Sequence, residues 1–277
     1  MDKEFWVSIA KNDYAIPGGH TLHELKDILF SYLGNNDPEL RDDIAYIVYA
    51  NWLKREMFTK DEVRAHVEEL LSNLDNGIGE TESDSIFLRT FSVLLLAEIV
   101  HNDNKKPLLE KDQIQSILAK GLWYLDAEKD SRGHIPVKGW AHALAHTADL
   151  MLVLGKNRQT EKGDLENILQ RIANKLVHSI NWVYIHGEDD RLTNAVMMIL
   201  QRDLVTTDFL KNWLKSFTEP EKLWNGAYTD EGQAKAFHNT RNFLRSLLVG
   251  IISTDDLKDK DGLQVIMNQA VTTLVPY

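Results

Sequence analysis

Two histidines and an aspartate recur at helical spacing near the middle of the chain. His142, His146 and Asp149 occupy positions i, i+4 and i+7, which fall on one face of an α-helix. Imidazole and carboxylate groups at this spacing can hold a divalent metal ion such as zinc, manganese, iron or nickel. In the alternative interpretation the histidines hydrogen-bond to Asp149, Glu128 or Asp130 and have no ligand.

The metal interpretation lacks parts of a complete site. The glutamate that stands between the two histidines of zinc proteases is absent here, because residues 143–145 are Ala, Leu and Ala. A fourth ligand would therefore have to come from another helix. The candidates are Asp84, Asp190, His134 and His238.

The stretch that carries these residues is almost wholly apolar. Between Gly139 and Leu154 there is no Lys, Arg or Glu, and Asp149 is the only full charge. A helix that is apolar nearly all round is a buried one. We therefore expect a buried central helix from Lys138, whose one polar stripe faces a crevice, another polar helix or a ligand.

Helical patterns alternate with short polar breaks along the rest of the chain. Thr21 and Thr59 each open a capping box, completed three residues later by Glu24 and Glu62. No run of alternating β-branched residues with hairpin turns is present, so no sheet is expected. The sequence predicts one all-α domain over residues 1–277, with an N-terminal extension at 1–20 and a long loop at 218–236 that folds over the groove described below.

A weak internal repeat indicates how the helices are arranged. Every second predicted helix opens with a polar turn and then becomes strongly apolar, at intervals of roughly 50 residues. The helices between them are amphipathic and more highly charged. This alternation is typical of stacked helical hairpins, and we predict a HEAT-like α-solenoid of about five hairpins. A closed α/α toroid is the alternative, because its helix pairing would look the same in sequence.

In a solenoid of this kind, the polar turns of the inner helices would share the concave face. We therefore predict a binding groove centred on the two histidines; in the alternative interpretation the polar side chains satisfy helix ends of the next hairpin. Arg41, Asn194 and Arg241 would share this face. The predicted groove residues are Asp84, Arg89, Arg132, His134, Trp140, His142, His146, Asp149, Asp190 and Arg191.

The turn before the central helix carries alternating charges. If the site is functional, Arg132 binds an anionic group while a carboxylate or His142 does acid–base chemistry. In the structural alternative Arg132 pairs with Glu128, and Gly133 supplies a positive-φ turn.

Composition excludes several classes of function. The formal charge of −11 and the lack of a basic cluster argue against nucleic-acid binding. The absence of cysteine excludes disulfides and thiolate metal sites. The N-terminus has no signal-peptide pattern, and no apolar run is long enough to span a membrane. We expect a cytoplasmic protein.

Five segments resemble motifs of a known family. They are residues 83–92, 128–134, 138–149, 188–192 and 242–247, and the Gly-Trp-Ala-His run is the most specific. Together they resemble the bacterial family known only as domain of unknown function 2785, from about Leu40 to about Leu248. The resemblance implies a small, soluble, helical bacterial protein, of a kind common in Gram-positive bacteria, and no particular activity.

Two functional hypotheses follow. The first is a binding module whose partner is a protein, a peptide or a small-molecule ligand. The second is a metal-dependent hydrolase that uses His142, His146 and Asp149 as ligands and a nearby carboxylate as general base. Binding is preferred, because the residues do not complete a catalytic constellation. The sequence leaves the ligand open.

Overall fold

Helices make up nearly all the regular structure of the protein. The computed structural model describes residues 1–178, 180–219 and 223–274. Within these ranges the only strands form a single short hairpin, so the fold is all-α as predicted. None of the helices in these ranges is long and apolar enough to cross a membrane.

The chain divides into two compact units. The N-terminal unit contains Met1–Lys120 and Ala127–His146, and the C-terminal unit contains Gly121–Asp126 and Thr147–Tyr277. Two helices, α6 (Lys111–Ala127) and α7 (Ala143–Lys156), contribute residues to both units. We describe each unit by itself.

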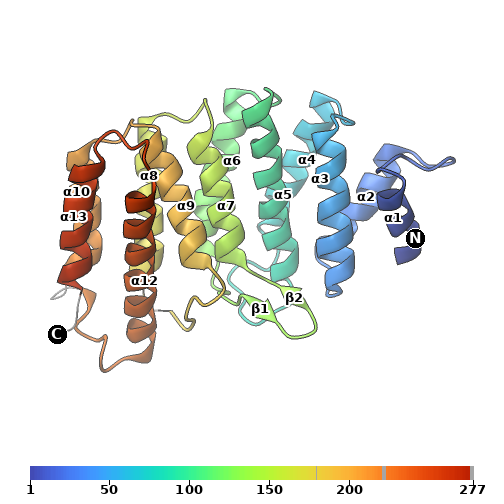
Figure 1. Cartoon of the computed structure of the whole chain (residues 1–277). Helices are drawn as coiled ribbons and strands as arrows, with labels where there is room; N and C mark the ends of the chain where they lie inside the picture. The colour runs from blue at the N-terminus through green and yellow to red at the C-terminus, as the bar shows by residue number, and fades with distance from the viewer. Residues whose placement is uncertain (179, 220–222, 275–277) are drawn as a thin grey trace. The chain divides into compact units, whose positions relative to one another are not determined.

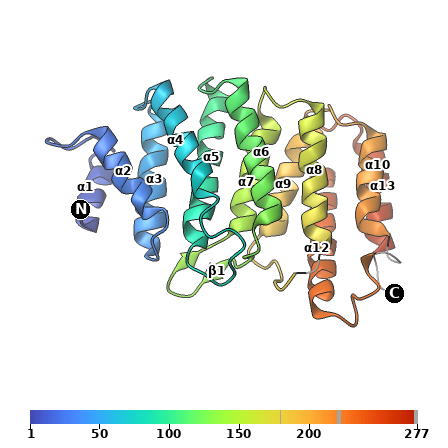
Figure 2. The same cartoon turned by 180° about the vertical axis from the view of Figure 1, so that it is seen from behind.

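The N-terminal unit is built from paired helices and the hairpin. Its elements are α1 (Lys3–Lys11), α2 (Leu22–Tyr32), the π-helix η1 (Glu39–Tyr46), α3 (Ile47–Lys54), α4 (Lys60–Asn73), α5 (Ile86–Lys105), β1 (His134–Ile135) and β2 (Gly139–Trp140). Helix α4 lies behind α3 and α5 in Figure 1 and in front of them in Figure 2. The helices therefore pack in two layers around an aromatic core.

Capping chemistry sets where these helices begin. Thr59 and Glu62 form the predicted capping box of α4, in which each side chain accepts a hydrogen bond from the other residue's backbone N–H. Thr21 caps α2 by accepting a hydrogen bond from the Glu24 N–H at 3.2 Å. The Glu24 carboxylate lies 3.6 Å from His20 Nδ1, and the reciprocal half of this box is not formed.

The C-terminal unit repeats the two-layer pairing. Its helices are α8 (Lys162–Val177), α9 (Glu188–Gln201), α10 (Thr207–Thr218), α12 (Glu231–Ser253) and α13 (Lys260–Thr273). Helix α12 packs against α9 and α13, while α10 packs against α8 and α13 (Figures 1 and 2). Trp213, Phe217 and Phe243 contact one another in the core between these helices.

Three predicted boundaries are wrong. Helix α7 begins at Ala143 rather than Lys138, because residues 138–142 belong to the hairpin and its exit. The sequence also predicts a long helix from about Asp164 to about Tyr184, whereas helix α8 ends at Val177. Helix α12 begins at Glu231, where Asp230 caps it, so the predicted loop at 218–236 is shorter; residues 220–222 of that loop lie outside the described ranges.

Candidate functional site

The β1–β2 hairpin is the main feature that sequence reasoning missed. Its strands pair antiparallel, with His134 opposite Trp140 and Ile135 opposite Gly139. The turn between them places Val137 at φ +69° and Gly139 at φ +78°. The predicted positive φ at Gly133 is not present; Gly139 has that role. Pro136 and Gly139 are the residues from which this turn could have been predicted in the sequence.

The hairpin is held against η1 by contacts distant in sequence. Arg41 Nη2 donates a 2.8 Å hydrogen bond to the Lys138 carbonyl. A Cβ at position 139 would lie 2.8 Å from Pro38 Cβ, so the backbone approaches η1 closely only because residue 139 is glycine. Lys138 Nζ also lies 2.7 Å from the Asp84 carboxylate. These contacts fix the hairpin on the unit.

Arg41 is the buried centre of this attachment. Its guanidinium lies over the rings of Phe87 and Phe91, at 4.1 and 4.8 Å from their centroids. Its Nε is 2.8 Å from the Asp42 carboxylate. Burial raises the pKa of the Asp42 carboxyl to about 6, against the opposing effect of the Arg41 charge. Arg41 therefore lies in the core and does not line a groove.

Arg89, a predicted groove residue, is also buried. It forms a two-pronged ion pair with Glu128, with N–O distances of 2.7 and 3.2 Å. Its Nη1 also donates to the Asn76 carbonyl and to Ser85 Oγ. The structural interpretation holds for this residue, because its guanidinium joins α5 to the end of α6.

Arg132 pairs with Asp130 instead of Glu128. The distance from Arg132 Nη2 to Asp130 Oδ2 is 2.6 Å, and Nη2 also donates to the Ser83 carbonyl. Asp130 accepts a further hydrogen bond from the Glu82 N–H. The charged turn is thus a structural network that ties residues 82–83 to residues 130–132.

Three aromatic side chains form a layer on the hairpin. Trp140 stacks on His142 with a centroid distance of 4.7 Å and an interplanar angle of 22°. The His134 ring meets the Trp140 ring edge-on, with a centroid distance of 4.9 Å. His142 is buried, whereas His134 and Trp140 are exposed. The layer thus presents an aromatic surface supported by a buried ring.

His142 is not a helical residue. Its φ is +53°, and its carbonyl accepts a hydrogen bond from the His146 N–H, so it stands immediately before α7. The predicted i, i+4 pair on one helix is therefore wrong in detail, although the two imidazole centroids lie 5.7 Å apart. Only Ala141 and His142 separate β2 from α7, and the positive φ of His142 lets the chain turn from the strand into the helix within these two residues.

The hydrogen bonds of Thr90 indicate which ring nitrogen of neutral His146 carries the proton. Thr90 Oγ1 lies 2.6 Å from the Ala141 carbonyl and 2.6 Å from His146 Nδ1. A carbonyl can only accept, so the hydroxyl donates to Ala141 and accepts from His146 Nδ1–H. Neutral His146 is therefore assigned a proton on Nδ1 and an unprotonated Nε2. This contact does not make Thr90 an activated nucleophile, because a base would have to accept the hydroxyl proton at Nδ1.

The remaining predicted groove residues lie in the C-terminal unit. Asp149 forms an ion pair with Arg191. Burial raises the pKa of the Asp149 carboxyl, while the charge of Arg191 lowers it. Asp190 is exposed in the acidic first turn of α9, the position where carboxylates favour a helix N-terminus. Asp149 and Arg191 thus form an ion pair within this unit, and Asp190 has the position of a helix-end carboxylate.

The predicted metal site is not assembled. In the described ranges no group of three or more His, Cys, Asp or Glu side chains is gathered as potential metal ligands. Asp149 pairs with Arg191, and Asp84 pairs with Lys138. The structure thus supports no ligand set of His142, His146 and Asp149.

The fold and the hairpin define an all-α protein with a fixed aromatic surface. The model of the family described as protein of unknown function (DUF2785) matches residues 74–249, which is more than half of the chain. The chain belongs to this family, and the resemblance seen in the sequence is confirmed. No curated protein and no solved structure was found to match it.

Proposed function

We propose that this protein is a binding module and that its partner, a segment of another protein, contacts the β1–β2 hairpin. The observation that carries this proposal is a large apolar side chain exposed on a strained backbone. Val137 is 93% exposed and Trp140 is 39% exposed. Aromatic residues with a rigid support are typical centres of protein interfaces.

Backbone strain supports a role for the hairpin beyond folding. A β-branched residue at φ +69° is a conformational outlier, with a cost of order 1–3 kcal/mol. Such strain persists only where the surroundings impose it, and it is concentrated at ligand-contacting segments. At Val137 the imposed conformation leaves an apolar side chain in solvent.

The hairpin is also organised in advance for binding. Ala141 N–H donates to the Gly133 carbonyl at 2.9 Å, and His142 N–H donates to the Arg132 carbonyl at 3.0 Å. Together with the Arg41 and Asp84 contacts to Lys138, these bonds hold both ends of the hairpin. Binding of a partner would therefore cost little conformational entropy, because the hairpin is already ordered.

The test is site-specific photocrosslinking followed by an affinity measurement. A photoreactive residue at position 137 should capture one defined protein from an extract of the source organism, whereas the same residue at Val265, 67% exposed on α13, should not. The captured protein, once purified, should bind the unmodified chain, and Trp140→Ala should weaken that binding by about thirtyfold. Equal capture at both positions, or unchanged affinity in Trp140→Ala, would disprove the proposal.

A further inference from the structure

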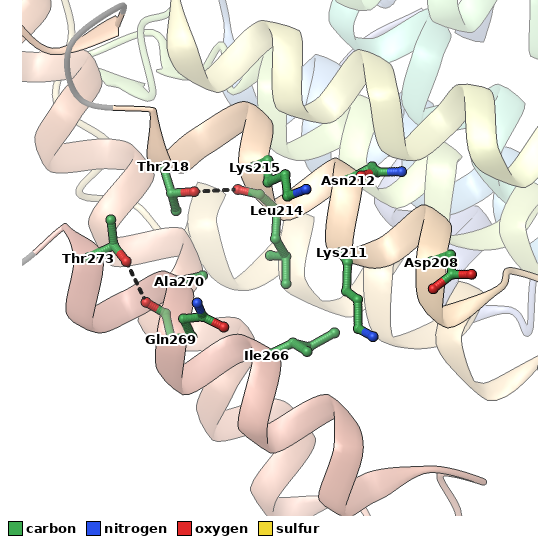
Figure 3. A pocket seen from close by; sticks show the side chains of 10 residues that line it. All are labelled: Asp208, Lys211, Asn212, Leu214, Lys215, Thr218, Ile266, Gln269, Ala270 and Thr273. Atoms are coloured by element: carbon green, nitrogen blue, oxygen red, sulfur yellow. Dashed lines mark hydrogen bonds between the residues drawn. The ribbon is translucent and has the colours of Figure 1, made fainter.

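The C-terminal unit contains a groove of about 520 Å³ between α10 and α13 (Figure 3). This volume is within the range of small-molecule sites. Its apolar floor is formed by Leu214, Ile266 and Ala270. Its polar rim consists of Asp208, Lys211, Asn212, Lys215, Thr218, Gln269 and Thr273. The groove is therefore apolar along its floor and polar along its edges.

The floor of the groove is closed. Beneath it, Leu210, Trp213 and Met267 pack between α10, α12 and α13 and leave a space of only about 10 Å³. That space is about the smallest that can hold one water molecule. A ligand would therefore lie along the groove in contact with Leu214 and Ile266, without entering the core.

Two lysines give the rim a positive charge. Lys211 and Lys215 are one helical turn apart on α10, and both are exposed. In an acidic chain, several other lysines pair with carboxylates, such as Lys120 with Asp75 and Lys258 with Asp203. Within the part of the chain that the structure describes, neither Lys211 nor Lys215 has an ion-pair or hydrogen-bond partner. The groove thus offers two ammonium groups to an anion.

The other polar groups favour binding of an anion at one end of the groove, the end that carries Lys215. Thr218 and Thr273 donate their hydroxyl protons to the Leu214 and Gln269 carbonyls (Figure 3). Asp208 stands one turn before Lys211 and would repel an anion there. Lys215 lies two turns from Asp208, roughly 10 Å along the helix axis. An anionic group is therefore favoured at Lys215, two turns from Asp208.

We propose that this groove binds a small amphipathic carboxylate. Its carboxylate contacts Lys215, and its aliphatic chain covers Leu214, Ile266 and Ala270. Burial of the chain and a charge-assisted hydrogen bond both contribute to the affinity. The site is independent of the β1–β2 hairpin.

Calorimetric titration of the full chain with octanoate tests the proposal. We expect one octanoate per chain, and at least about tenfold weaker binding of acetate, which lacks the chain, and of octanol, which lacks the charge. Equal affinity for acetate would indicate a simple anion site, and equal affinity for octanol would indicate a simple apolar patch. Either outcome, or no binding of octanoate, overturns the proposal.

Matched variants locate the site. Lys215→Gln should weaken octanoate binding about tenfold, and Lys211→Gln should weaken it less, because the carboxylate lies at the Lys215 end. Lys162→Gln removes the same charge from α8, outside the groove, and should leave binding unchanged. Circular dichroism establishes that each variant is folded. Unchanged affinity in folded Lys215→Gln, or an equal loss in Lys162→Gln, contradicts the assignment.

Discussion

Most of the polar side chains that the sequence analysis predicts to line a groove form ion pairs or hydrogen bonds with residues of their own unit. Arg89 is held by Glu128, and Arg132 by Asp130. Removing one partner of a buried ion pair leaves an uncompensated charge, which is far more costly than the net value of the pair. Arg89 and Arg132 therefore have structural roles in the unit that carries the hairpin.

His66 is buried and neutral, and we expect it to make the stability of the protein depend on pH. It lies among Phe30, Tyr49 and Phe58, and its Nδ1 is 3.1 Å from the Tyr49 hydroxyl. Burial, with the nearby positive charge of Lys26, lowers the pKa of His66 from 6.5 to about 4. The unfolded chain thus binds a proton more readily than the folded one. The contribution of His66 to the free energy of unfolding is fully present above pH about 6.5. It is lost as the pH falls towards about 4, and the loss is about 3 kcal/mol.

Urea denaturation across this pH range measures the effect. His66→Phe should reduce the fall in unfolding free energy between pH 6.5 and pH about 4, whatever its effect on stability at neutral pH. The matched control is His101→Phe, which replaces an exposed histidine of α5 that does not contribute to the pKa shift of His66, and this variant should leave the slope closer to that of the unsubstituted chain. An unchanged slope in His66→Phe would contradict the assignment of a buried neutral imidazole.

At the scale of elements, the hairpin depends on the π-helix beside it. The wider turns of η1 carry Arg41, and Pro38, the residue immediately before η1, lies against Gly139. The helix and the hairpin are almost one hundred residues apart in sequence, and the Arg41 hydrogen bond to the Lys138 carbonyl joins them. The aromatic surface is therefore positioned by this tertiary contact.

Gly139→Ala should detach the hairpin. The added Cβ would lie 2.8 Å from Pro38 Cβ and would also disfavour the positive φ, so we expect a loss of about 1–3 kcal/mol in unfolding free energy. Gly19→Ala is the matched control, since Gly19 has φ +85° but no neighbour within 4 Å. Denaturation should show a larger loss for position 139. Equal losses would mean that the close approach to η1 contributes nothing.

At the scale of the whole molecule, each unit contains helices that pack against one another in pairs. The sequence repeat predicts that about five such hairpins continue in one open stack, with a closed toroid as the alternative. A compact chain of this length has a radius of gyration of about 19 Å. An open stack is elongated and should exceed that value in small-angle X-ray scattering. A value of about 19 Å would favour the toroid.

The sequence by itself determined that the protein is all-α and where most of its helices lie. Capping residues such as Thr59, and apolar positions at helical spacing, are local signals, and the elements they predict are present. Family membership was also readable, because the Gly-Trp-Ala-His run is contiguous. Local patterns of this kind need no knowledge of what packs against them.

Only the tertiary structure decided which conformation the central motif adopts. Periodicity placed residues 138–142 on a helix, but Gly139 and His142 have positive φ and belong to a hairpin and its exit. That conformation is imposed by Arg41 and Pro38, whose contacts outweigh the helical preference of the local sequence. The groove between α10 and α13 likewise exists only because two distant helices pack side by side. Long-range contacts of this type leave no periodic signal in a single sequence.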